Sequence, residues 1–220
     1  MIAVVDYCKG NLKSVERGLR AVGGDARITD NPDEIRAADA VVLPGVGSFA
    51  DASAHMVESG QMDAVRSAIA AGKPFLGICL GEHLLFENGV EGAAGPGVDG
   101  DPESPDLPVG LGEIEGTVVR MPAQDAEGAT YKVPHVGWNS VELTSACPLF
   151  EGIDSGEYFY FTHSYVAPEN EYTVATTTHA VTFPCAVQKG NVFGVQFHPE
   201  KSSDAGAKVL ANFLKVVNGQ

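Results

Sequence analysis

The sequence is poor in basic residues, and this limits the partners that the protein can bind. Fourteen Lys and Arg stand against 29 Asp and Glu, which gives a formal net charge of −15. Nucleic acids and anionic membranes bind surfaces on which Lys and Arg dominate, so we expect neither as a partner. A solvated acidic surface that keeps the chain soluble explains the charge, and adaptation to high salt is an alternative.

Cysteine and long apolar runs are also scarce. The four cysteines lie far apart and form no C-x-x-C pair, so we expect neither disulfides nor a zinc site. No run approaches the roughly 18 apolar residues of a membrane span, and the apolar residues 2–5 are too few for a signal peptide. Glycine-rich phosphate-binding motifs are missing as well. We expect a soluble, cytoplasmic protein without a metal or nucleotide cofactor.

Short apolar runs alternate with helical patterns in the first half of the chain. The expected elements are strands at 2–5, 40–43 and 75–78, and helices at 12–22, from 32 onward and at 62–71. Asn11 and Asn31 precede two of these helices and are expected to cap them. Alternation of this kind is typical of a parallel sheet with helices on both faces.

The second half is dominated by strand patterns. They cover 117–120, 138–141, 158–165, 172–178, 185–188 and 192–197, and a helix at 205–217 closes the chain. The segment 88–108 is loaded with Gly, Pro, Asp and Glu, and we expect a flexible surface loop or insertion because strand patterns resume after it. At 220 residues, the chain is expected to form a single α/β domain over 1–220.

The pentapeptide Gly77-Ile78-Cys79-Leu80-Gly81 puts one cysteine between an apolar strand and a helical pattern. A sharp strand-to-helix turn leaves little room for neighbouring Cβ atoms, which favours glycine on both sides. Such a turn would expose the sulfur at a helix N-terminus that favours thiolate, with the Leu80 N–H directed at a developing oxyanion. This motif alone leaves open an inert buried cysteine in a glycine-rich turn.

The tripeptide His198-Pro199-Glu200 supplies a base for such a cysteine. Proline favours extended backbone at the residue before it, and residues two apart in an extended segment share a face. Glu200 is therefore expected to reach the His198 imidazole and to fix its tautomer, as in nucleophile-and-base acyl transfer. The strand at 192–197 would bring His198 to the same sheet edge as Cys79. Without Cys79, a surface turn would be the simpler interpretation.

Together these motifs resemble those of the class I (triad) glutamine amidotransferases. Within that family they are similar in particular to the glutaminase subunit of imidazole glycerol phosphate synthase, an enzyme of histidine biosynthesis. The resemblance runs from the first strand to the last helix, and only 88–108 falls outside it. The segments that carry it are DYCKGNLKSV at 6–15, LPGVG at 43–47, GICLG at 77–81, PHVGWN at 134–139, FTHSY at 161–165 and GVQFHPEKS at 194–202.

The resemblance implies a catalytic triad and the fold that holds it. Cys79 would be the nucleophile, His198 the general base and acid, and Glu200 the residue that orients His198. The fold would be a flavodoxin-like open, mostly parallel sheet with helices on both faces and a smaller β-rich second half. The N–H groups of Val46 and Leu80 would form the oxyanion hole. Residues resembling those that line the L-glutamine pocket are Gly45, Gly47, His83, His163, Ser164 and Tyr165.

The resemblance also implies a partner protein. The family's synthase subunit is a (β/α)8-barrel cyclase, which would form a heterodimer with this chain, receive ammonia through an internal tunnel and close the imidazole ring. Asn11, Trp138 and Lys201 match family positions near that interface. Such glutaminases often need the partner to complete the active site, so we expect partner-dependent turnover.

The chain departs from the family pattern directly after Leu80-Gly81. The family usually has Met-Gln there, and the glutamine helps to hold the substrate, whereas this chain has Glu82-His83. An imidazole offers one hydrogen bond in place of the paired geometry of an amide. Three functions stay open: the synthase glutaminase, a related glutaminase that feeds a different synthase, and a non-catalytic interaction protein. The last is supported only by His83.

Overall fold

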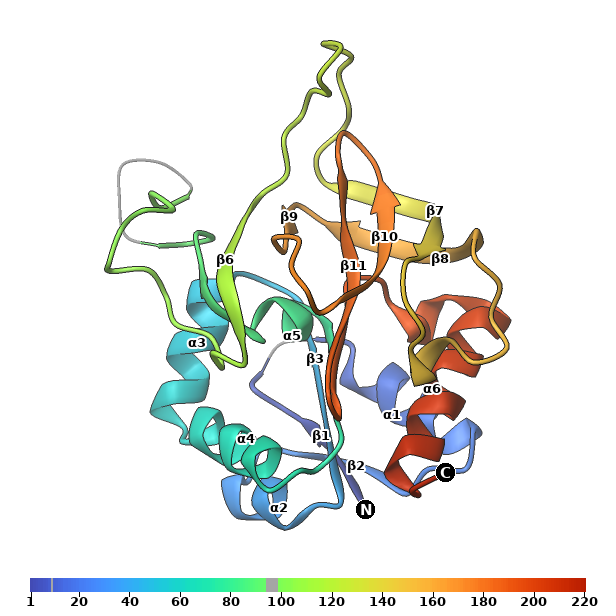
Figure 1. The fold of residues 1–220 in the computed structure, drawn as a ribbon. Helices are drawn as coiled ribbons and strands as arrows, with labels where there is room; N and C mark the ends of the chain where they lie inside the picture. The colour runs from blue at the N-terminus through green and yellow to red at the C-terminus, as the bar shows by residue number, and fades with distance from the viewer. Residues whose placement is uncertain (9, 94–98) are drawn as a thin grey trace.

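The computed structural model describes residues 1–8, 10–93 and 99–220 of the chain (Figure 1). A large sheet has the strand order β2-β1-β3-β4-β12-β11-β10-β7-β8, and a small sheet has the order β5-β6-β9. The strands are Ile2–Val5 (β1), Ala26–Thr29 (β2), Ala40–Gly45 (β3), Phe75–Cys79 (β4), Phe86–Gly89 (β5), Ile114–Arg120 (β6), His135–Leu143 (β7), Glu157–His163 (β8), Tyr165–Val166 (β9), Thr173–Thr178 (β10), Thr182–Lys189 (β11) and Val192–Val195 (β12). The helices are Leu12–Ala21 (α1), Pro32–Ala37 (α2), Phe49–Glu58 (α3), Gln61–Ala70 (α4), Leu80–His83 (α5) and Ser203–Val217 (α6), with 3₁₀ turns at Pro148–Phe150 (η1) and Pro199–Lys201 (η2).

One half of the large sheet is parallel and is covered by helices on both faces. Strands β2, β1, β3, β4 and β12 run in the same direction. Because neighbouring residues of a strand point to opposite faces, Val4 and Val42 pack into the core with α1 and α6, whereas Val5 and Val41 pack with α2, α3 and α4. Figure 1 shows these two groups of helices on opposite sides of the sheet. The predicted parallel sheet with helices on both faces is confirmed.

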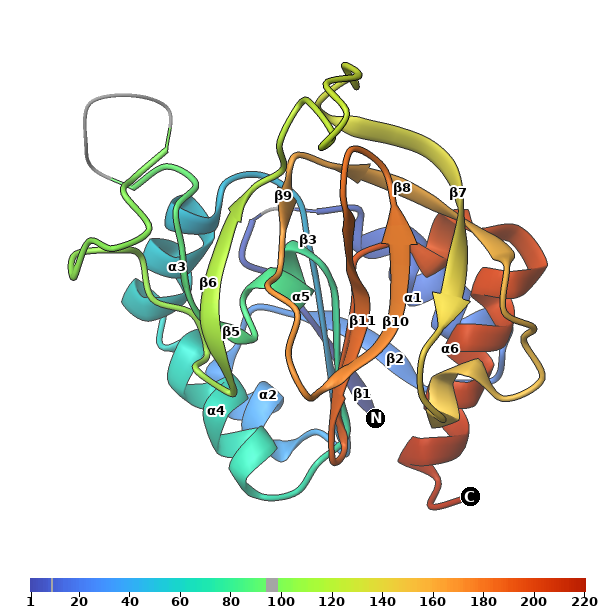
Figure 2. The ribbon, with the colours of Figure 1, turned by 45° about the horizontal axis from the view of Figure 1, so that its top comes forward.

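The strand-rich second half extends the same sheet. Strand β11 pairs antiparallel with β12, and β10, β7 and β8 follow in antiparallel order, so the large sheet is mixed. On β8, Phe159, Phe161 and His163 are buried, whereas Tyr158 on the opposite face is exposed. Figure 2 shows β6 and β9 of the small sheet side by side, as their pairing requires.

The sequence did not predict helix α3, which spans Phe49–Glu58. Its N-terminus is capped by Ser48, whose side chain accepts a hydrogen bond from the Asp51 N–H at 3.2 Å. The buried residues Phe49, Ala52 and Met56 recur at helical spacing, which is the signal that could have identified this helix.

The two predicted helix caps have different outcomes. Asn31 caps α2 as predicted and accepts from the Asp33 N–H at 2.9 Å. Asn11 occupies the N-cap position of α1 as predicted, but its side chain makes no capping hydrogen bond. Its backbone torsions, φ −90° and ψ 55°, differ from the extended conformation with which Asn31 caps α2.

The segment predicted as a loop over 88–108 is partly structured. Asn88 and Gly89 belong to β5, which pairs with β6, and Glu91 forms an isolated bridge with Asp99. Residues 94–98 of this segment, and Lys9 of the first motif, lie outside the described residues. Among the residues that the structure describes, no helix is long and apolar enough to cross a membrane.

Candidate active site

The turn between β4 and α5 holds Cys79 in a conformation that few residues adopt. Its φ of 54° lies in the left-handed region, which costs a non-glycine residue energy and is common at functional sites. A Cβ at Gly77 would lie 2.3 Å from the Gly81 carbonyl oxygen, and one at Gly81 would lie 1.7 Å from the Leu43 carbonyl oxygen. The helix approaches the sheet this closely only because both residues are glycine, as the motif predicted.

Parallel pairing brings His198 to the same edge of the sheet as Cys79. Strand β12 lies next to β4, with Val195 opposite Ile78, and His198 follows three residues after β12 ends. The Nδ1 atom of His198 lies 2.9 Å from Oε1 of Glu200, as predicted. The backbone differs from the prediction, since only His198 is extended and Glu200 lies in the turn η2.

The electrostatics of His198 differ from those of the other buried histidines at the site. Burial disfavours its charged form, but the Cys79 sulfur and the Glu200 carboxylate together raise the pKa of His198 to about 9. Its Nε2 atom is buried and forms no hydrogen bond of ordinary geometry within the described residues. The side chains of His198 and Glu200 are only 3% and 2% exposed, so solvent screens their pairing little.

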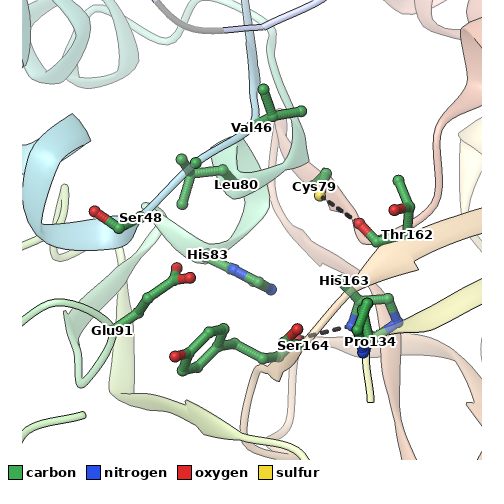
Figure 3. A pocket seen from close by; sticks show the side chains of 12 residues that line it. Val46, Ser48, Cys79, Leu80, His83, Glu91, Pro134, Thr162, His163 and Ser164 are labelled. Carbon is green, nitrogen blue, oxygen red and sulfur yellow. Dashed lines mark hydrogen bonds between the residues drawn. The ribbon is translucent and has the colours of Figure 1, made fainter. Parts of the chain in front are cut away.

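A pocket of about 350 Å³ opens above Cys79 (Figure 3). Its wall includes most of the residues that the family resemblance implied: Val46, Gly47, Leu80, His83, His163, Ser164 and Tyr165. Gly45 is buried in β3, where it pairs with Cys79, and a Cβ there would lie 1.6 Å from the Tyr7 hydroxyl oxygen. Gly45 thus lets the chain pass Tyr7, and the residues that follow it reach the pocket.

Both ring nitrogens of His163 are engaged inside the protein. Its Nδ1 lies 2.8 Å from the Tyr165 carbonyl oxygen, and its Nε2 lies 3.0 Å from Nδ1 of His135. Because the carbonyl only accepts, His163 donates through Nδ1, and His135 must donate to its Nε2. Burial lowers the pKa of His163 to about 3, so the ring is neutral. The ring of His163 therefore has no free nitrogen for a ligand.

Glu91 and Ser48 also line the pocket, and sequence reasoning missed both. Glu91 lies in the segment predicted as a surface loop, where its carboxylate accepts from the Phe49 N–H at 3.1 Å. Burial, which the hydrogen bond from Phe49 only partly offsets, raises the pKa of Glu91 to about 7. An acidic residue within a glycine-rich stretch was the available signal, and it was too weak to separate Glu91 from its acidic neighbours.

The three residues predicted at a partner interface are all exposed. Trp138 on β7 is 50% exposed and packs edge-on against Tyr160 of β8, and Nζ of Lys201 lies 5.7 Å from the centroid of the same Tyr160 ring. Asn11 is exposed at the start of α1. A tryptophan at a core position would be buried, so the exposed Trp138 favours a contact surface.

Comparison with known proteins identifies the family. The model of the glutamine amidotransferase class-I family matches residues 3–217. The chain belongs to the class-I glutamine amidotransferases. It is 45% identical over 218 residues, 98% of its length and 95% of the other, to the imidazole glycerol phosphate synthase subunit HisH of Moorella thermoacetica. The HisH subunit of Caldanaerobacter subterraneus subsp. tengcongensis is 42% identical over 219 residues, 99% of this chain and 98% of the other.

Solved structures support the amidotransferase fold. A crystal structure of a glutamine amidotransferase matches with a TM-score of 0.71 at 21% identity, over 99% of this chain and all of the other. The glutaminase domain of Trypanosoma brucei CTPS, solved with bound acivicin, matches with a TM-score of 0.67 at 15% identity, over 100% of this chain and 94% of the other. These likenesses concern the fold alone.

Proposed function

We propose that this class-I amidotransferase is the glutaminase subunit of imidazole glycerol phosphate synthase and hydrolyses L-glutamine to L-glutamate and ammonia. The observation that carries the proposal is that Cys79 lines the pocket and that His198, paired with Glu200, interacts with the Cys79 sulfur. A cysteine, a histidine base and a carboxylate that orients the histidine are the groups that acyl transfer requires. Full-length similarity to HisH subunits supports the same role.

The pocket suits a small amino acid with a charged end. In Figure 3, Glu91 lies on the opposite side of the view from Cys79 and Thr162, and His83 lies between them. The Glu91 carboxylate would pair with the α-ammonium group of glutamine, and that charge would favour the ionised form of Glu91. The backbone at 163–165 and the His83 ring would contact the rest of the amino-acid end. The side-chain amide would then lie over the sulfur.

Acylation would begin with attack of the Cys79 sulfur on the amide carbon of glutamine. The thiol proton would be held on Nε2 of His198 before the attack, in line with the pKa of about 9 of that ring, and the N–H groups of Val46 and Leu80 would stabilise the oxyanion. The protonated His198 then gives its proton to the leaving nitrogen. The C–N bond breaks, ammonia departs, and a thioester of Cys79 remains. Glu200 stabilises the imidazolium of His198 until the ring gives up this proton.

Deacylation would reuse the same groups. His198 takes a proton from a water molecule, which attacks the thioester carbon through a second oxyanion. The C–S bond breaks, the sulfur leaves as the thiolate beside the protonated His198, and glutamate leaves the pocket after its new carboxyl group gives its proton to solvent. No metal is needed for either half of this cycle, since the positioned base and oxyanion donors supply the catalysis.

The ammonia would pass to a (β/α)8-barrel cyclase partner, in a heterodimer that makes imidazole glycerol phosphate for histidine biosynthesis. The exposed Trp138, Lys201 and Asn11 would contact this partner. Residues 1–220 would act as a single amidotransferase domain. Support comes from the words "subunit HisH" in the names of the full-length relatives and from the exposed aromatic side chain of Trp138.

The test is glutamate release from glutamine, with and without the barrel subunit and its nucleotide substrate. We expect release that rises with the partner and is lost in Cys79→Ala. Cys147→Ala is the matched control, because Cys147 is also buried but lies outside the pocket. If no glutamate is released although the complex forms, the glutaminase proposal is wrong and a non-catalytic role is favoured. Equal turnover with and without the barrel would contradict partner dependence.

A further inference from the structure

A row of buried polar side chains connects Glu82-His83, where this sequence differs from the family pattern, to the Cys79 sulfur. Glu82, His83 and Gln196 are 0%, 4% and 0% exposed. The Nε2 atom of His83 lies 2.7 Å from Oε1 of Gln196, and Nε2 of Gln196 lies 3.7 Å from Sγ of Cys79. Gln196 lies two residues before His198 and is not used in the catalytic steps above.

The direction of this chain follows from the donors available. The Oε1 atom of Gln196 can only accept, so His83 must donate through Nε2–H. That contact turns the other end of the amide, its NH₂ group, toward Cys79. Burial lowers the pKa of His83 to about 4, with the Gln196 and Tyr165 contacts opposing the shift, so the ring is neutral and holds one proton.

Two neighbours of the sulfur besides His198 favour opposite protonation states. The Thr162 carbonyl oxygen lies 3.9 Å from Sγ and can accept the S–H of a thiol, but it would repel a thiolate. The Gln196 NH₂ group can only donate, so it stabilises the thiolate. A hydrogen bond to the charged form of an acid favours that form.

We propose that Gln196 is a positioning residue for Cys79: His83 holds the Gln196 amide so that its N–H group donates to the sulfur and favours the reactive thiolate. The proposal rests on the proposed role of Cys79 as the nucleophile. It also assigns His83 a function: its hydrogen bond within the protein fixes Gln196, whatever contact His83 makes with the substrate.

Other titratable groups near the sulfur could also affect its protonation. They are His198 and Glu200 after β12, Tyr7 after β1, Glu82 and His83 in α5 and His163 at the end of β8. Glu82 lies 3.7 Å from the His83 ring, but burial raises the pKa of Glu82 to about 8 while that of His83 falls. The contact therefore joins two neutral groups at pH 7, and alkylation is best compared below pH 8, before Glu82 ionises.

The experiment follows alkylation of Cys79 by iodoacetamide between pH 5 and pH 8, because only the thiolate reacts. Peptide mass spectrometry separates Cys79 from the exposed Cys8. Gln196→Leu removes the amide, and we expect the midpoint of the alkylation profile to rise by about one unit, with a rate about tenfold lower at pH 6. His83→Leu should shift the profile in the same direction by a smaller amount.

His83→Gln is the conservative variant, since its amide can still donate to Oε1 of Gln196. We expect it to retain the wild-type alkylation profile. Unfolding curves of each variant check that it is folded, and His83→Leu tests the same link if Gln196→Leu does not fold. A profile that is unchanged or shifted downward in a folded variant would overturn the proposal, because the amide would then not favour the thiolate.

Alkylation requires no glutamine turnover, so its outcomes distinguish failure of the nucleophile role from failure of the Gln196 role alone. If wild-type Cys79 reacts no faster than an ordinary thiol, both the nucleophile role and the role of Gln196 are wrong. If wild-type Cys79 is reactive and Gln196→Leu and His83→Leu leave its profile unchanged, only the role of Gln196 is wrong.

Discussion

Two groups of buried ionisable residues lie around Cys79, and they differ in the atoms that face them. His198 is paired with the Glu200 carboxylate at 2.9 Å and lies near the Cys79 sulfur, and its pKa is raised to about 9. His163 faces only another imidazole and a carbonyl oxygen, and burial lowers its pKa to about 3. Both rings are buried and yet have opposite charge states, so the partner atoms decide which histidine carries a proton at neutral pH.

Glu82 extends the comparison to carboxyl groups. The Glu200 side chain has His198 as a partner, whereas neither oxygen of Glu82 has a hydrogen-bond partner within the described residues. Burial alone raises the pKa of Glu82 to about 8. A buried acid without a charged partner stays neutral and costs stability once it is forced to ionise. The site thus combines a charged pair, His198 and Glu200, with neutral buried groups such as Glu82 and His163. Three substitutions test this difference.

The largest effect is expected from His198→Ala. It removes the only one of these histidines that is protonated at neutral pH, and with it the base and the acid of the proposed cycle. We expect glutamate release by the partner complex to fall by about a thousandfold. His55→Ala, in helix α3, is the matched control and should retain wild-type turnover. Substantial activity in His198→Ala would mean that another group moves the proton.

Glu200→Gln should have an intermediate effect and should sharpen the contrast between the two groups. The amide keeps the shape but removes the charge that helps to raise the pKa of His198. We expect turnover to fall by about a hundredfold. The protonated ring is needed to release ammonia, so the wild-type kcat/KM should decline as pH rises through about 9. In Glu200→Gln that decline should begin at a lower pH. An unchanged alkaline limb would show that Glu200 does not set the charge of His198.

Glu82→Met should have the smallest effect on turnover at neutral pH and a pH-dependent effect on stability. The pKa of Glu82 is about 8 in the folded chain and near 4.5 when unfolded, so unfolding releases a proton between these values. Wild-type stability is therefore penalised increasingly from about pH 4.5 to pH 8, and Met removes this penalty. The gain in the free energy of unfolding should be small at pH 5 and reach several kcal/mol, in order of magnitude, at pH 8.

Denaturant unfolding of wild type and Glu82→Met at both pH values measures this difference directly. The pH 5 comparison serves as the control, because packing differences between Glu and Met contribute equally at both values. A gain that does not grow with pH would show that Glu82 is ionised at little cost in the native state, through contacts other than those described.

The sequence predicted the regular parts of the fold because their signals are local. Apolar runs identified β1, β3 and β4, and the Asn31-Pro32 pair marked the start of α2. Helix α3 was missed because its stripe of Phe49, Ala52 and Met56 is short and includes a small residue. Glu91 was missed since nothing local distinguishes an acidic residue that lines a pocket from one in a surface loop.

The sequence by itself determined the reactive residue types, the glycines around Cys79 and the adjacency of His198 to Glu200, because each depends on neighbours within a few positions. Only the tertiary structure decided that β12 lies beside β4. This pairing brings together Cys79 and His198, which are 119 positions apart in the sequence. It also decided that His198 is charged while His83 and His163 are neutral, since charge depends on burial and on partner atoms that arrive from distant strands.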